Sequence, residues 1–88
     1  MAEALDRLEL QVERLTSLLA EDDYGESWTV SPVRDKGKVI VTAERGTPNE
    51  EGWARTSVVL PLGTLEALDD EALVRQVRIR VKAYRMGW

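Results

Sequence analysis

Three short runs of acidic residues come closest to a catalytic or metal-binding pattern. They are Asp22-Asp23, Glu50-Glu51 and Asp69-Asp70-Glu71, and paired carboxylates serve both acid–base chemistry and Mg²⁺ binding. Neighbouring residues on a helix point about 100° apart, however, so they do not easily share one ion. None of the runs has the spacing of a calcium-binding loop. These acids therefore do not predict a metal or catalytic site.

The chain contains no histidine and no cysteine. Histidine is the commonest general base and a frequent metal ligand, and cysteine is required for thiolate metal sites, nucleophilic thiols and disulfides. We therefore expect a protein that is not an enzyme. We also expect no catalytic residues, no metal, no cofactor and no small-molecule substrate.

Basic residues collect near the C-terminus, where Arg75, Arg78, Lys82 and Arg85 would share one side of a helix. Such a face could follow a phosphate backbone. The whole chain, however, has a net charge of −4 and a pI near 4.8, whereas domains that bind nucleic acids usually have a pI above ~9. Nucleic-acid binding is therefore the less favoured interpretation, and a solvated or internally paired basic face is favoured over it.

Residues 45–53 contain two glycines and a proline and predict the longest loop. Loops often carry recognition residues, which makes Glu50, Glu51 and Trp53 candidates for a partner contact. A single tryptophan beside a strand is more often a core residue with one polar edge. Both interpretations of Trp53 remain open at this point.

The first element that must position these groups is a helix predicted over residues 2–22. Six apolar residues recur at alternating spacings of four and three: Met1, Leu5, Leu8, Val12, Leu15 and Leu19. They fall within about 80° of one another, which is narrower than the stripe of at least ~100° expected of a helix on a globular core, although Ala4 and Leu18 widen the stripe on one side. We favour self-association through this stripe over docking on the chain's own sheet or binding another protein's helix. The predicted oligomer interface is Met1, Leu5, Leu8, Val12, Leu15, Leu18 and Leu19.

Charge is divided between the two ends of the chain. Residues 1–26 hold eight acids and two arginines, whereas residues 74–88 hold five basic residues and no acid. The acids at 21–26 would crowd the negative end of the helix dipole. They are either solvated or paired with the basic C-terminal segment.

Three strands are predicted, over residues 27–34, 38–44 and 54–62. The first two read as a hairpin closed by Asp35-Lys36-Gly37, the pattern of a type I turn with a G1 bulge. Pro32 and Pro61 favour edge positions, because proline cannot donate to a strand ladder. On the middle strand, Val39, Val41 and Ala43 alternate with Ile40, Thr42 and Glu44.

The last segment fits two periods. A strand pattern of alternating apolar and basic residues covers 77–84, while a helical pattern covers 70–85. The ends favour the helix, since Asp69 is a good N-cap and Leu68 with Leu73 forms a hydrophobic staple. The alternative is a helix that ends near Gln76, followed by a fourth strand.

Together these elements predict an α+β fold with an N-terminal amphipathic, coiled-coil-like helix, a three-stranded antiparallel sheet and a C-terminal helix. Residues 1–23 form the helix and residues 27–88 a small β-β-β-α domain, within one structural unit. The expected function is a non-enzymatic assembly or protein-interaction module that binds a second copy, as a dimer or trimer, or another protein. A small viral or phage structural, adaptor or regulatory protein fits this description.

Two further functions remain as alternatives. One is a nucleic-acid-binding regulator that uses the basic C-terminal helix. The other is an inhibitor of a macromolecule that acts by acidic surface mimicry. The chain lacks both an apolar run of about 20 residues and a signal-peptide pattern, so we expect no membrane partner and a cytoplasmic or virion location.

Overall fold

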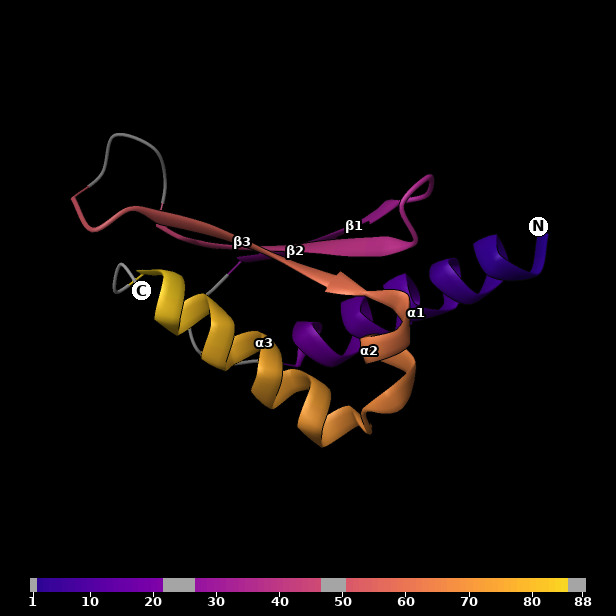
Figure 1. Cartoon of the computed structure of the whole chain (residues 1–88). Helices are drawn as coiled ribbons and strands as arrows, with labels where there is room; N and C mark the ends of the chain where they lie inside the picture. The colour runs from indigo at the N-terminus through magenta and orange to yellow at the C-terminus, as the bar shows by residue number, and fades with distance from the viewer. Residues whose placement is uncertain (1, 22–26, 47–50, 86–88) are drawn as a thin grey trace.

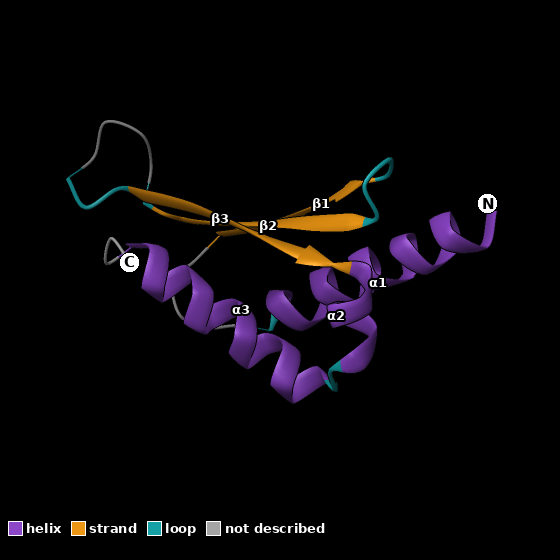
Figure 2. Cartoon of the chain, in the orientation of Figure 1, coloured by secondary structure: helices purple, strands orange, loops and turns teal. Residues whose placement is uncertain are grey.

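The computed structural model describes residues 2–21, 27–46 and 51–85, and the side chains of 6–21, 27–46 and 51–84. The three strands form one antiparallel sheet in the order β1-β2-β3. All three helices lie on the same side of this sheet (Figures 1 and 2). The elements are α1 (Ala2–Ala20), β1 (Ser27–Val33), β2 (Lys38–Arg45), β3 (Ala54–Pro61), α2 (Leu62–Ala67) and α3 (Asp70–Arg85). The predicted α+β fold is confirmed.

The turn between β1 and β2 follows the predicted chemistry but is one residue longer. Val33 pairs with Lys38, so four residues lie between the strands. The Lys36 N–H donates to the Val33 carbonyl at 3.1 Å, and Gly37 has a φ of 62°, a conformation that costs glycine little. Arg34 belongs to the turn because this hydrogen bond ends the strand at Val33.

Helix α2 begins directly after β3, at Leu62, which was predicted to be the last residue of the third strand. Pro61 occupies the N-cap position in an extended conformation, and proline is compatible with both a strand end and a helix start. The Leu62 N–H donates to the Gly37 carbonyl at 3.0 Å. The start of α2 is thereby held against the β1–β2 turn.

Helix α3 spans the predicted residues, and no fourth strand forms there. The side chain of Asp69 accepts a hydrogen bond from the Ala72 N–H at 2.8 Å, which is the predicted N-cap. Leu73, Val77 and Val81 are buried, at the i, i+4 spacing of one helix face. The helical period prevails because this face packs beneath the sheet.

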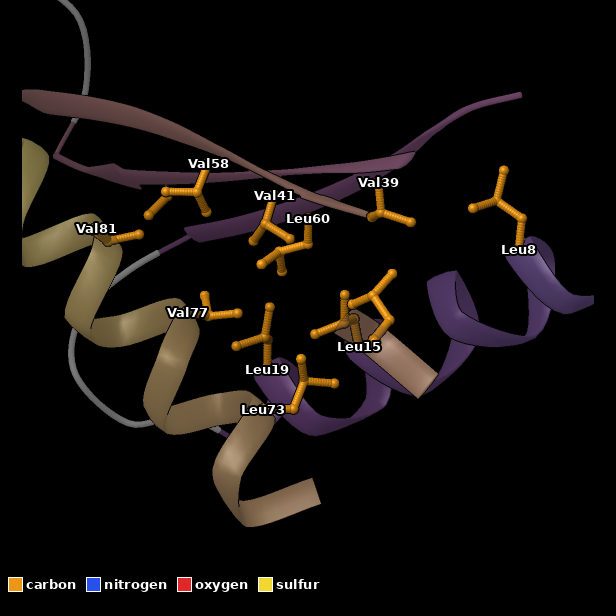
Figure 3. Packing of buried hydrophobic residues seen from close by; sticks show 12 residues of the cluster. Leu8, Leu15, Leu19, Val39, Val41, Val58, Leu60, Leu73, Val77 and Val81 are labelled. Atoms are coloured by element: carbon orange, nitrogen blue, oxygen red, sulfur yellow. The ribbon is translucent and has the colours of Figure 1, made fainter. Parts of the chain in front are cut away.

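The hydrophobic core lies between the helices and one face of the sheet (Figure 3). Every helix contributes to it, and Leu8 lies at one end of the cluster (Figure 3). The first turns of α1 extend past the β1–β2 turn (Figure 1), in a molecule of 45 × 25 × 25 Å. The buried hydrophobic residues in the described part of the chain are Leu8, Leu15, Leu19, Val39, Val41, Ala43, Val58, Leu60, Leu65, Leu73, Val77 and Val81.

Candidate interaction surfaces

The apolar stripe of α1 packs on the chain's own sheet and helices. Leu8, Leu15 and Leu19 are at most 1 % exposed, and Val12 and Leu18 are half-buried against the same cluster. These five side chains were predicted to face a second copy. In the folded chain they are covered by its own core, so they leave little surface for another chain.

The burial of two residues of the predicted oligomer interface is not described by the structure. The side chain of Leu5 and all of Met1 fall outside the described residues. Their role in self-association stays a prediction. The burial farther along α1 matches docking on the chain's own sheet, which was the second interpretation of the stripe.

Arg14 fixes α1 to the chain that joins α2 and α3. Its guanidinium donates to the carbonyls of Leu65 and Leu68, both at 2.7 Å. It also donates to Asp70 Oδ1 at 2.7 Å and to Gln11 Oε1 at 3.0 Å. The last carbonyls of a helix have no partner within that helix. A side chain of α1 therefore caps the C-terminal end of α2.

Two exposed ion pairs hold the outer side of α1. Arg7 binds the carboxylate of Glu66 on α2, and Arg34 from the β1–β2 turn binds Glu9 at 2.6 Å. The hydrogen bond from Arg7 lowers the pKa of Glu66 below its usual value, because it favours the ionised carboxylate. In the described residues, the arginines of α1 thus pair with acids of α2 and α3.

The predicted pairing between the acids at 21–26 and the basic C-terminal segment falls largely outside the described residues. Only Glu21 of that acidic run is described, and it is exposed. Asp22 and Asp23, the first predicted carboxylate pair, also lie outside them. That interpretation stays a prediction.

The basic face of α3 is divided among different environments. Arg75 pairs with Glu71 one turn earlier, at 3.2 Å. Arg78 is half-buried and Lys82 is exposed, while the side chain of Arg85 is not described. Arg80, which the sequence did not single out, donates to the Val59 carbonyl on β3 at 3.5 Å. The three predicted residues whose side chains are described therefore do not present one uniform cationic stripe.

The acids of the third predicted run have structural partners. Asp69 caps α3, Asp70 binds Arg14 and Glu71 binds Arg75. Over residues 2–21, 27–46 and 51–85, no three acidic side chains gather closely enough to hold a metal ion. In the same residues, no helix is both long and apolar enough to cross a membrane.

The long loop returns to the sheet through Trp53. Its indole Nε1–H donates to Glu44 Oε2 on β2 at 3.1 Å, and its side chain is 41 % exposed. Of the predicted loop contacts, Glu51 is exposed and Glu50 lies outside the described residues. Trp53 is therefore placed on the side of the sheet that the helices leave uncovered.

Among the residues that the structure describes, no helix or further strand lies over the face of the sheet opposite the helices (Figure 1). We call this surface the open face. The strand register arranges its outward residues in four rows across the sheet. From the loop end to the turn end, the rows are Ser27–Glu44–Arg55, Thr29–Thr42–Ser57, Ser31–Ile40–Val59 and Val33–Lys38–Pro61.

The open face changes character along the strands. Toward the β2–β3 loop it is polar, with an open depression whose lining includes Glu44 and Arg55 and with the Thr42 and Ser57 hydroxyls 2.9 Å apart. Toward the β1–β2 turn it carries Ile40 and Val59 side by side, and Val59 is 46 % exposed. The open face therefore joins an apolar patch to a polar, charged half.

The sequence alone predicts the residues of the open face only in part. Alternation on β2 separates Ile40, Thr42 and Glu44 from the opposite set, but both sets begin with β-branched residues. Alternation identifies two faces without showing which one the helices cover. The open face could be recognised only once the helices were placed.

No family model, curated protein or solved structure matches this chain. Proposals about its function therefore rest on its own residues and their geometry.

Proposed function

We propose that this chain is a non-enzymatic protein-interaction module that self-associates through the open face of its sheet. Antiparallel sheets often expose one polar face to water. What supports a contact here is that two β-branched apolar side chains, Ile40 and Val59, lie together on that face. Val59 is one of the large hydrophobic side chains that stay exposed.

The small size of the chain favours the same proposal. Chains of fewer than about 100 residues bury a smaller fraction of their surface than larger domains do. Because Leu8, Leu15 and Leu19 already belong to the core, further apolar burial has to come from another surface. Packing two open faces, with the sheets about 10 Å apart, would remove Ile40 and Val59 from water.

The size of the open face indicates a weak dimer. Three strands at ~4.8 Å spacing, with about seven residues each at ~3.4 Å, give a face of roughly 14 by 24 Å. The projected area of such a face is about 340 Å², less than half of the roughly 800 Å² that standard specific interfaces bury on each partner. We therefore expect a dissociation constant of about 1–100 μM.

The test replaces the apolar patch without disturbing the strands. In the variant Ile40→Thr/Val59→Thr both positions stay β-branched, so strand propensity is preserved while apolar surface is lost. Sedimentation velocity from about 1 to 500 μM should show the parent moving from monomer to dimer and the variant remaining monomeric.

The matched control is Leu10→Gln, which removes an apolar side chain that is 60 % exposed on α1, far from the open face. It should dimerise like the parent. A parent that stays monomeric over the whole concentration range would contradict self-association. A dimer that persists in Ile40→Thr/Val59→Thr would place the contact elsewhere.

A further inference from the structure

The outward residues of β2 form a row whose charge is opposite at its two ends. Lys38, Ile40, Thr42 and Glu44 follow one another along the middle strand, so they run down the centre of the open face. The row begins with a cation and ends with an anion. Lys38 is exposed and Glu44 is half-buried.

Such a row is complementary to itself when it is reversed. We propose that two copies pack open face to open face about a two-fold axis that crosses β2 between Ile40 and Thr42, so that Lys38 of each copy faces Glu44 of the other. This arrangement rests on the self-association proposed above. It adds the orientation of the two copies and the residues that set it.

Electrostatics separate this arrangement from the main alternative. With a two-fold axis running along the strands, Lys38 would face Lys38 and Glu44 would face Glu44, and like charges in contact are unfavourable. With the axis across the strands, each dimer gains two opposite-charge contacts. Symmetry requires that both contacts be the same, as in any isologous interface.

The remaining groups on the open face are compatible with this orientation. Arg55 lies in the same row as Glu44, and it would face Pro61 of the second copy and not a cation. The two Ile40 side chains would lie on either side of the axis, about 7 Å apart along the strand, where they can interleave. The hydrogen bond from Trp53 to Glu44 leaves acceptor capacity, because an ionised carboxylate can accept several.

The experiment uses charge reversal in single and combined variants. Lys38→Glu should weaken self-association on the order of tenfold, because both contacts of the dimer become Glu facing Glu. Glu44→Lys should weaken it in the same way. The double variant Lys38→Glu/Glu44→Lys should recover an affinity near that of the parent, since every contact again joins opposite charges.

Mixing the two single variants gives a second, independent readout. One variant then offers two anions and the other two cations, so a heterodimer should form with an affinity near that of the parent. Lys36→Glu and Glu51→Lys are the matched controls, because these exposed residues lie outside the four rows and change the net charge equally. Both should dimerise like the parent, and circular dichroism should show the same fold for every variant.

The outcomes distinguish a failure of the two-fold arrangement from a failure of self-association through the open face. If the parent dimerises but neither the double variant nor the mixture recovers affinity, the two-fold arrangement is overturned while self-association stands. Single variants that dimerise like the parent would overturn it equally. A parent that is monomeric at every concentration removes both proposals.

Discussion

At the scale of single residues, the guanidinium of Arg14 joins three helices. It holds the carbonyl of Leu65 in α2, the carbonyl of Leu68 after it and the carboxylate of Asp70 in α3. Its side chain is only 21 % exposed, so water does not readily replace these hydrogen bonds. The planar guanidinium can bond all three oxygens, which a single ammonium group cannot do in the same geometry.

We expect Arg14→Lys to lower the free energy of unfolding by about 1–3 kcal/mol, because at least one buried carbonyl loses its partner. Urea denaturation followed by circular dichroism measures this change. The matched control is Arg34→Lys, since the ion pair of Arg34 with Glu9 is exposed and such pairs contribute at most about 1 kcal/mol. Equal effects of the two substitutions would show that Arg14 has no special role.

Glu66 gives the fold a dependence on acid pH. Its pKa in the folded chain is lowered from 4.5 by the hydrogen bond from Arg7, so the stabilising contact is fully present above the pKa of the unfolded chain. It is lost as the pH falls through the lower pKa of the folded state. We expect Glu66→Gln to be less stable than the parent at pH 7 and to approach it as the pH drops below about 4.

Urea denaturation at a series of pH values measures the difference between these two proteins. In a chain that also carries Arg7→Gln, the substitution Glu66→Gln should make no difference at any pH, because the hydrogen-bond donor is gone. A difference that persists in acid, or in the Arg7→Gln background, would assign the effect to something other than this pair.

At the scale of elements, α1 has the narrow apolar stripe of a coiled coil but serves as a core helix. The sheet it covers is small, and Leu8, Leu15 and Leu19 are enough to reach it. Residues around the stripe, such as Arg14 and Gln11, then fill polar positions where α1 meets α2 and α3. A narrow stripe is therefore compatible with docking when the remaining inner positions are satisfied by hydrogen bonds.

This role predicts how a core residue of α1 behaves in dilute solution. Leu15→Ala should lower the free energy of unfolding by about 2–5 kcal/mol, because it leaves a cavity beneath the sheet. The effect should be independent of protein concentration, since Leu15 packs within one chain. Leu10→Ala, on the exposed side of the same helix, should change stability by less than about 0.5 kcal/mol.

Urea denaturation at two protein concentrations distinguishes the two roles of α1. If the effect of Leu15→Ala depended on concentration, the stripe would contribute to an interface between chains, as the heptad pattern first indicated.

At the scale of the whole molecule, one small core lies between a sheet and three helices. In the described part of the chain, no helix or further strand covers the other side of the sheet (Figure 1). The edge strands β1 and β3 each carry a proline, and proline cannot donate to an added strand. Arg80 also occupies the Val59 carbonyl of β3. These features disfavour growth of the sheet at its edges, so contact through the open face is the arrangement that we propose.

Much of the fold follows from local sequence. The N-cap Asp69 and the turn glycine Gly37 act within a few residues of themselves, so the bounds of α3 and the β1–β2 hairpin could be predicted closely. The same holds for the α+β class. The start of α2 at Leu62 was missed, because the hydrogen bond from its N–H to Gly37 joins residues far apart in the chain.

The amino-acid sequence alone shows which residues share a face of each helix and strand, because alternation and helical period are local properties. Only the tertiary structure decided which face meets which neighbour. It placed the stripe of α1 against the chain's own sheet, joined Arg14 to α2 and α3, and left Ile40 half-buried and Val59 exposed on the open face. These outcomes depend on how helices and strands distant in sequence pack together. Because the hydrophobic effect is non-directional, a local sequence pattern does not specify which neighbour will cover an apolar face.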